Sequence, residues 1–61
     1  MGKYIEYGYD RKARSWCIIV FDKNGFEISS SYLGNKESLE YELERLKEEY
    51  KVKKIIKIKA Y

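Results

Sequence analysis

The residues best suited to chemistry are carboxylates in the second half of the chain. They recur at spacings of 3, 4 and 4, which places them along one stripe of a helix. Paired carboxylates can serve acid–base chemistry, but on a helix they are far more often a solvated face. The alternative is an acidic stripe that mimics phosphates and binds a basic groove on a nucleic-acid-handling protein. The stripe consists of Glu37, Glu40, Tyr41, Glu44 and Glu48.

Other catalytic equipment is missing from the chain. It contains no histidine, which removes the usual general base near neutral pH and the commonest nitrogen ligand for zinc. Cys17 is the single cysteine and cannot build a thiolate metal site; within the apolar run 16–21 it is expected to behave as a small core residue. The four glycines are scattered and form no phosphate-binding loop. We therefore expect a protein without enzymatic activity, cofactor or metal.

The elements that must position these residues follow from the apolar pattern. Leu39, Leu43, Leu46 and Tyr50 recur at spacings of 4, 3 and 4, which predicts an amphipathic helix that begins after an N-cap at Asn35. Four other segments are β-branched, aromatic or alternating, as strands are. The expected strands cover residues 3–9, 15–21, 26–33 and 52–61.

These elements predict one small α+β domain over residues 1–61. Its order is β-β-β-α-β, and a four-stranded sheet in the spatial order 3-2-1-4 carries one helix packed on one face.

The turn chemistry predicts the register and the two faces of the sheet. Asn24-Gly25 is typical of a two-residue type I′ hairpin, which pairs Phe21 with Ile28 and sets the register along both strands. A three-residue turn is expected before the second strand. The face expected beneath the helix then consists of Ile5, Tyr7, Cys17, Ile19, Phe21, Ile28, Ser30 and Tyr32.

The opposite face is expected to stay open, because one helix cannot cover both faces of a four-stranded sheet. An apolar centre with a polar, aromatic rim is typical of a protein-binding surface. The leading hypothesis is therefore protein recognition, with a foreign partner or with a second copy in a homodimer. The residues expected on this surface are Tyr4, Trp16, Ile18, Val20, Ile55, Lys57, Lys59 and Tyr61.

Nucleic-acid binding is the alternative. Residues 16–50, with W-x-x-x-V-x-D-x-x-G followed by a cap and an amphipathic helix, resemble the DNA-binding domains of the AP2 and integrase arm-type families. The resemblance implies a sheet face placed in the major groove. The fourth strand departs from that pattern, and so do Ile18 and Val20, where a groove reader needs polar side chains. Phosphate and base contacts would come from Arg11, Lys12, Arg14, Trp16, Lys57 and Lys59.

Charge and size complete the sequence-based expectations. The net charge is +3, but residues 37–50 carry six Glu against Arg45 and Lys47 (−4), and residues 51–61 carry five lysines and no acid (+5). Lysines on an edge strand also deter pairing with other chains, so these five lysines can be explained without a ligand. No apolar run approaches a membrane span, so we expect a cytoplasmic protein. In size and composition the chain resembles small phage-encoded inhibitors such as anti-CRISPR proteins, which would act in the host cytoplasm.

Overall fold

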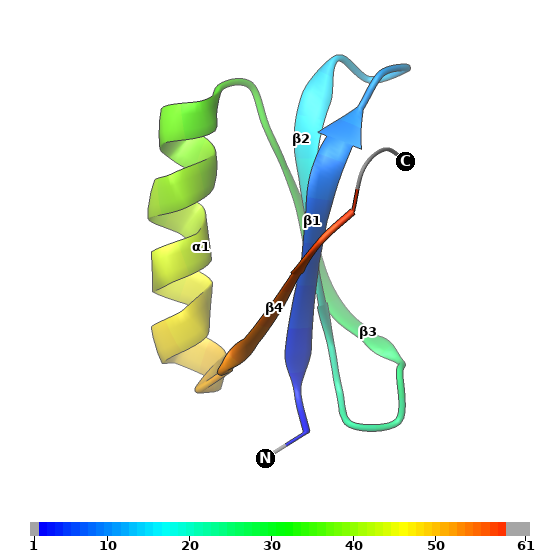
Figure 1. The fold of residues 1–61 in the computed structure, drawn as a ribbon, viewed down its shortest axis with the longest axis vertical. Coiled ribbons are helices and arrows are strands. Elements are labelled where there is room, and N and C mark those ends of the chain that lie inside the picture. The colour runs from blue at the N-terminus through cyan, green and yellow to red at the C-terminus, as the bar shows by residue number, and fades with distance from the viewer. Residues whose placement is uncertain (1, 59–61) are drawn as a thin grey trace.

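The computed structural model describes residues 2–58, which form one small α+β domain (Figure 1). The sheet has the order β3-β2-β1-β4; β4 runs parallel to β1, and the other neighbours are antiparallel. The predicted architecture and strand order are therefore confirmed. In chain order the elements are β1 (Tyr4–Asp10), β2 (Ser15–Phe21), β3 (Glu27–Leu33), α1 (Lys36–Tyr50) and β4 (Lys54–Lys57).

The turn between β1 and β2 is one residue longer than expected. It spans residues 11–14, and Asp10 Oδ1 accepts the backbone N–H groups of Lys12 (3.0 Å) and Ala13 (3.2 Å). Arg14 closes the turn in the left-handed region at φ 53°. This length sets the pairing of the two strands, with Ile5 opposite Val20.

The turn between β2 and β3 also differs from the expected type I′ hairpin. The N–H of Gly25 donates to the carbonyl oxygen of Asp22 (3.0 Å), and Gly25 has φ 86°. Asn24 does not adopt the positive φ that a type I′ turn requires, and its N–H donates to Asp22 Oδ1 instead (2.8 Å). The loop therefore has three residues, with Asp22 paired to Phe26 beside it.

A β-bulge absorbs the extra loop residue. Phe21 pairs with Glu27 in place of the expected Ile28, and the register shifts between Val20 and Phe21. Beyond this point the register agrees with the prediction, so Val20 still lies opposite Ser29. The three-residue loop and the β-bulge offset each other, so the predicted pairing is wrong only next to the turn.

Helix α1 is capped at both ends. The Asn35 side chain accepts the N–H of Ser38 (2.8 Å), as an N-cap should. At the other end Lys51 lies in the left-handed region (φ 54°, ψ 48°), and the N–H of Val52 donates to the carbonyl oxygen of Lys47 (2.9 Å). Left-handed geometry there is usually supplied by glycine.

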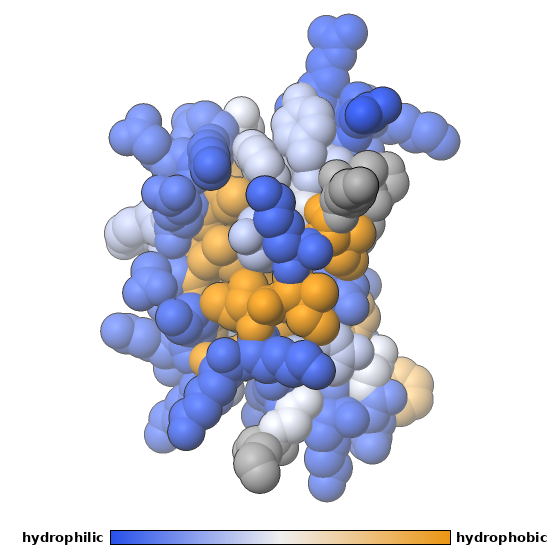
Figure 2. Space-filling model, viewed as in Figure 1, coloured by the Kyte–Doolittle hydropathy of each residue, from blue (hydrophilic) through white to orange (hydrophobic). Residues whose placement is uncertain are grey.

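The hydrophobic core lies between α1 and one face of the sheet (Figure 1). Seen from the β4 edge, an apolar region extends over β4 and toward α1, with hydrophilic side chains above and below it (Figure 2). The partly buried Tyr7, Trp16, Leu33, Leu43, Tyr50 and Ile55 pack around the buried residues. The buried residues are Ile5, Ile18, Val20, Leu39, Leu46 and Val52.

On β2, β3 and β4 the face that α1 covers is the opposite of the predicted one, whereas Ile5 and Tyr7 of β1 lie beneath the helix as predicted. Ile18 and Val20 are fully buried beneath the helix, so the expectation that they lie on an open face is wrong. Both parities of β2 are apolar, so alternation could not decide the side. On β3 the helix side carries the small, half-buried Ser29 and Ser31, which suit the close approach of α1 to that strand.

Candidate functional site

The sheet face away from α1 is covered by no other element among residues 2–58 (Figure 1). The strand registers assign its members, because residues directly opposite each other in a sheet share a face. We call this surface the open face. It consists of Tyr4, Glu6, Gly8, Asp10, Ser15, Cys17, Ile19, Phe21, Glu27, Ser30, Tyr32, Lys54 and Ile56. Ile28, which the register leaves unpaired, joins this face by alternation with Ser29 on β3.

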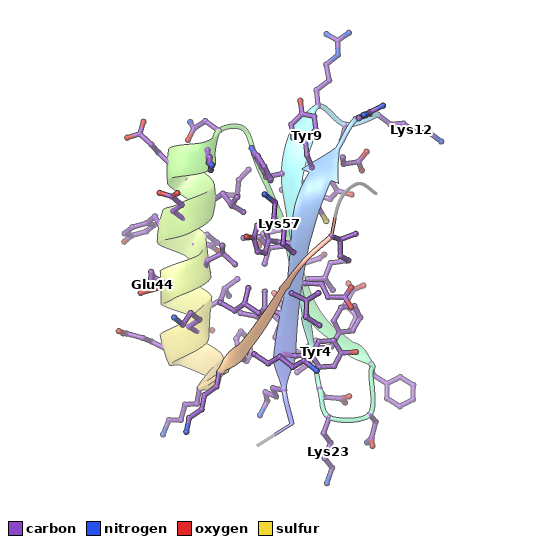
Figure 3. The ribbon with its side chains drawn as sticks, viewed as in Figure 1. Tyr4, Tyr9, Lys12, Lys23, Glu44 and Lys57 are labelled. Carbon is purple, nitrogen blue, oxygen red and sulfur yellow. The ribbon has the colours of Figure 1, made fainter. Side chains whose placement is uncertain are left out.

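Aromatic rings form a layer on the open face. Tyr4 and Phe21, opposite each other on β1 and β2, stack with ring centroids 5.0 Å apart and an interplanar angle of 19°. Tyr4 is directed away from α1 (Figure 3). Tyr32 lies across from Cys17, which is 4% exposed. The rings thus bury the smaller side chains of the sheet and present their own outer surfaces to a partner.

Three of the five exposed large hydrophobic side chains of the described residues lie at β3 and its hairpin. Ile28 is 40% exposed, Tyr32 57% and Phe26 69%. Ile28 is the residue that the β-bulge leaves unpaired, and Phe26 follows the turn directly. An apolar group of this kind beside polar side chains is typical of an interaction surface.

Acidic side chains share the open face with this apolar group. Glu6, Asp10 and Glu27 belong to the open face, whereas Lys54 is its one basic member among residues 2–58. Asp10 Oδ2 accepts the Tyr32 hydroxyl at 3.5 Å, and its Oδ1 accepts the N–H of Lys12 in the β1–β2 turn that follows. The open face therefore combines exposed apolar side chains on the edge strand β3 with a net negative charge, to which Glu6 contributes from mid-sheet and Asp10 and Glu27 from strand ends.

The same surroundings affect Cys17. Burial raises the pKa of its thiol, and the charges of Asp10 and Glu27 act in the same direction, while a hydrogen bond with Tyr32 opposes them. The neighbouring Cys17, followed by smaller effects that include Asp10, raises the pKa of Tyr32 in turn. Cys17 is buried, as the sequence predicts, but it lies beneath Tyr32 and not beneath the helix.

The predicted partner-binding residues divide between the two faces. Tyr4 lies on the open face, as expected. Ile18 and Val20 lie in the core, and Ile55 packs against it. Trp16 is half-buried on the helix side.

The aromatic and basic members of that prediction are also separated. The Trp16 ring meets the ring of Tyr9 edge-on at 5.4 Å. Lys57 is exposed on the helix side of β4, opposite Tyr7 (Figure 3). Lys59 and Tyr61 lie outside the described residues.

The residues expected to bind nucleic acid do not converge on one surface. Arg11, Lys12 and Arg14 are exposed in the β1–β2 turn, beyond the Asp10 end of β1. Lys57 lies beside Tyr7, halfway along the same strand. The structure therefore groups Arg11, Lys12 and Arg14 in one turn. Lys57 lies apart from that group.

The acidic stripe faces solvent on α1, as predicted. Its members are all exposed, with Tyr41 at 73%, and Glu44 is directed away from the sheet (Figure 3). The Lys47 ammonium lies 3.3 Å from the Glu44 carboxylate. A shallow hollow of about 260 Å³ is lined by Tyr41, Glu44, Arg45 and Glu48.

Arg45 is occupied within the helix. Its guanidinium contacts the carboxylates of Glu42 and Glu49, each at 2.6 Å. The hydrogen bond from Arg45 lowers the pKa of Glu42. These pairs follow the ordinary i, i+3 and i, i+4 spacing of an exposed helix.

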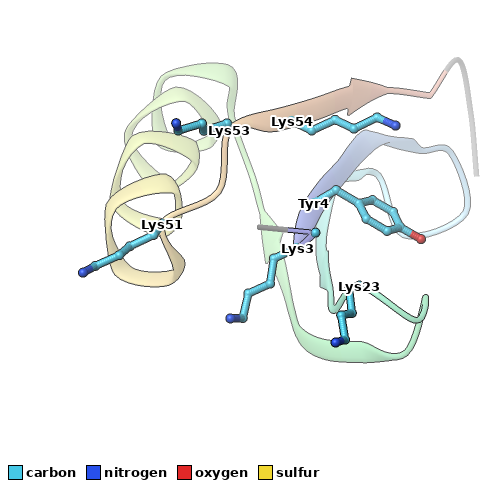
Figure 4. Close-up of a pocket in the computed structure, with 7 residues that line it drawn as sticks. Lys3, Tyr4, Lys23, Lys51, Lys53 and Lys54 are labelled. Carbon is cyan, nitrogen blue, oxygen red and sulfur yellow. The ribbon is translucent and has the colours of Figure 1, made fainter.

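A second surface escaped the sequence analysis. A hollow of about 630 Å³ opens at the end of the molecule where β1 begins and α1 ends (Figure 4). It joins residues far apart in the chain, so only the parallel pairing of β4 with β1 could have revealed it. The hollow is lined by Gly2, Lys3, Tyr4, Lys23, Lys51, Lys53 and Lys54.

The described residues carry neither a cluster of metal ligands nor a helix suited to a membrane. Residues 2–58 contain no group of three or more His, Cys, Asp or Glu side chains that could hold a metal ion. In the same part of the chain, α1 is too short and too polar to cross a membrane. Comparison with known proteins found no matching protein family, curated protein or solved structure.

Proposed function

We propose that this protein is a binding module without enzymatic activity, which recognises another protein through the open face. One observation carries the proposal: exposed Ile28 and Tyr32 stand on a sheet face that no element among the described residues covers. Aromatic and apolar side chains at the centre of a surface supply most of the affinity in protein interfaces.

The charges of the open face define the partner. Glu6, Asp10 and Glu27 give it a negative charge that Lys54 only partly offsets. A complementary surface combines apolar side chains with lysine or arginine. A second copy of the chain offers the same acidic charge, so a foreign protein fits better than face-to-face self-association.

The same charges count against the alternative of nucleic acid on the sheet. A phosphate backbone would be repelled by the three carboxylates, and no arginine lies on the open face to read base edges. The acidic stripe of α1 remains a second protein-binding candidate, although its hollow is small and its Glu44 carboxylate already pairs with Lys47. Small inhibitors that occupy a partner's surface, as anti-CRISPR proteins do, act in the way proposed here.

The proposal is tested with tagged wild-type protein and an Ile28→Lys variant as baits. A protein captured by the wild type and lost with Ile28→Lys is purified, and its affinity for both baits is measured. A drop of tenfold or more supports recognition through the open face. Equal affinity for both baits contradicts it. A wild-type dimer that Ile28→Lys splits, measured by light scattering, would assign the face to a second copy.

A further inference from the structure

The lysine-lined hollow is built from segments that are distant in the sequence. Lys3 precedes β1, Lys23 lies in the β2–β3 turn, and Lys51, Lys53 and Lys54 join α1 to β4. In Figure 4, Lys3, Lys23 and Lys54 lie beside the beginning of β1, and Lys51 and Lys53 lie on the α1 side. Five of the thirteen basic residues thus meet at one end of a small molecule, where mutual repulsion opposes folding.

No acidic side chain balances this charge within the lining. None of the five lysines forms an ion pair with another residue in the range 2–58. Asp22 is adjacent to Lys23 in sequence, but its Oδ1 accepts the N–H groups of Asn24 (2.8 Å) and Phe26 (3.0 Å). The hollow therefore presents a concentrated, uncompensated positive charge.

The backbone at Lys51 gives an independent indication. Lys51 adopts the left-handed conformation that follows a helix, a position where glycine avoids steric strain. Val52, 4% exposed, anchors the segment in the core and leaves its two lysine neighbours exposed. A lysine at this position is a poor choice for stability, which suggests that its ammonium group serves another purpose.

Close packing at the N-terminal side shapes the hollow. Gly2 has φ 115°, and a Cβ atom added there would lie 2.5 Å from Cβ of Lys23. Only glycine lets the chain approach Lys23 so closely. Tyr4, held by its stack on Phe21, forms an aromatic wall beside Lys54, its partner on β4.

From this arrangement we infer that the hollow binds a compact ligand with closely spaced phosphate groups. Lysine ammonium groups bind phosphate as point charges, and several around one cavity match a ligand with several negative charges. The volume of about 630 Å³ is that of a small-molecule site and suits a nucleotide-sized ligand. The hollow shares Tyr4 and Lys54 with the open face but none of the exposed Phe26, Ile28 and Tyr32.

Two variants test this site, and each replaces a basic residue of positive φ by glycine. Lys51→Gly removes one charge from the hollow and relieves left-handed strain, so the variant stays folded. Arg14→Gly is the control: it also removes one positive charge and relieves left-handed strain (φ 53°), but in the β1–β2 turn at the other end of β1. Binding of inorganic tripolyphosphate and of ATP without divalent metal is measured by calorimetry and by amide NMR shifts.

The expected result is one bound ligand per chain, with shifts at the hollow. Lys51→Gly should weaken binding about tenfold, and Arg14→Gly should leave it nearly unchanged. Equal weakening by both variants would show general charge attraction and would overturn the site. The proposed site would also be overturned if neither tripolyphosphate nor ATP binds. Binding of a single-stranded oligothymidylate without tripolyphosphate or ATP binding would assign the lysines to a nucleic-acid backbone and contradict the compact ligand.

Discussion

Cys17 and Tyr32 lie directly opposite each other on β2 and β3, yet Cys17 is 4% exposed and Tyr32 is 57% exposed. The tyrosine ring therefore shields the thiol on a face that no helix covers. This pair shows how the open face protects its own sheet while keeping an aromatic surface available. It also makes the state of the face measurable through a single cysteine.

The first prediction concerns that thiol. Because its pKa is raised, Cys17 should react with iodoacetamide at pH 7.5 far more slowly than a free cysteine. Tyr32→Ala uncovers the thiol and should speed the reaction severalfold, measured by mass spectrometry. Tyr41→Ala, which removes an exposed ring from the helix, is the control and should change nothing. Equal rates for the wild type and Tyr32→Ala would contradict the shielding.

The same pair predicts a loss of stability in alkali. The folded pKa values of Cys17 and Tyr32 are raised above their ordinary values of 9.0 and 10.0, so the folded state holds these protons more tightly than the unfolded state. Their contribution is present below pH 9 and is lost as the pH rises through the folded values. Urea melts between pH 7 and 11 should show the decline, and Cys17→Ala should reduce it.

Acid should act on α1 through Glu42. Arg45 lowers the pKa of this carboxyl below its ordinary value of 4.5, so its contribution to stability is present above that value and is lost as the pH falls further. We expect Arg45→Gln to flatten the pH dependence of thermal unfolding between pH 5 and 2. Lys36→Gln, which also removes one positive charge from α1, is the control. An unchanged acid profile in Arg45→Gln would rule out the pair as its cause.

The assignment of the two faces predicts unequal effects of one substitution. Ile18→Ala, at a fully buried site under α1, should lower the free energy of unfolding by about 2–5 kcal/mol. Ile28→Ala, at a site 40% exposed on the open face, should lower it by less than about 1 kcal/mol. Chemical denaturation measures both. Comparable losses would mean that the two faces are not distinguished as described.

These residues also show how far the sequence could predict the structure. The strand order, the helix and the register of Val20 with Ser29 follow from local patterns, and they are confirmed. The side on which α1 packs does not follow, because β2 is apolar on both parities and Ser29 and Ser31 gave no sign that they face the helix.

A clue to the correct side was nevertheless present in β1. On β1, Glu6 and Asp10 point to one face of the sheet and Ile5 and Tyr7 to the other. The charged residues indicate that their face is the one that α1 does not cover. The four-residue turn before β2 would have transferred that assignment to Ile18 and Val20. The lysine hollow could not be predicted in this way, since it depends on how the ends of β1, α1 and a hairpin meet in space.

The central claim is that the open face, and not α1, recognises a protein partner. The most direct test compares Tyr32→Lys with Tyr41→Lys, two identical substitutions of exposed tyrosines, in calorimetric titrations with the purified partner. We predict that Tyr32→Lys weakens binding about thirtyfold or more, as expected for a residue worth about 2 kcal/mol, while Tyr41→Lys changes it less than threefold. Loss of binding with Tyr41→Lys and retention with Tyr32→Lys would place recognition on the helix and contradict the claim.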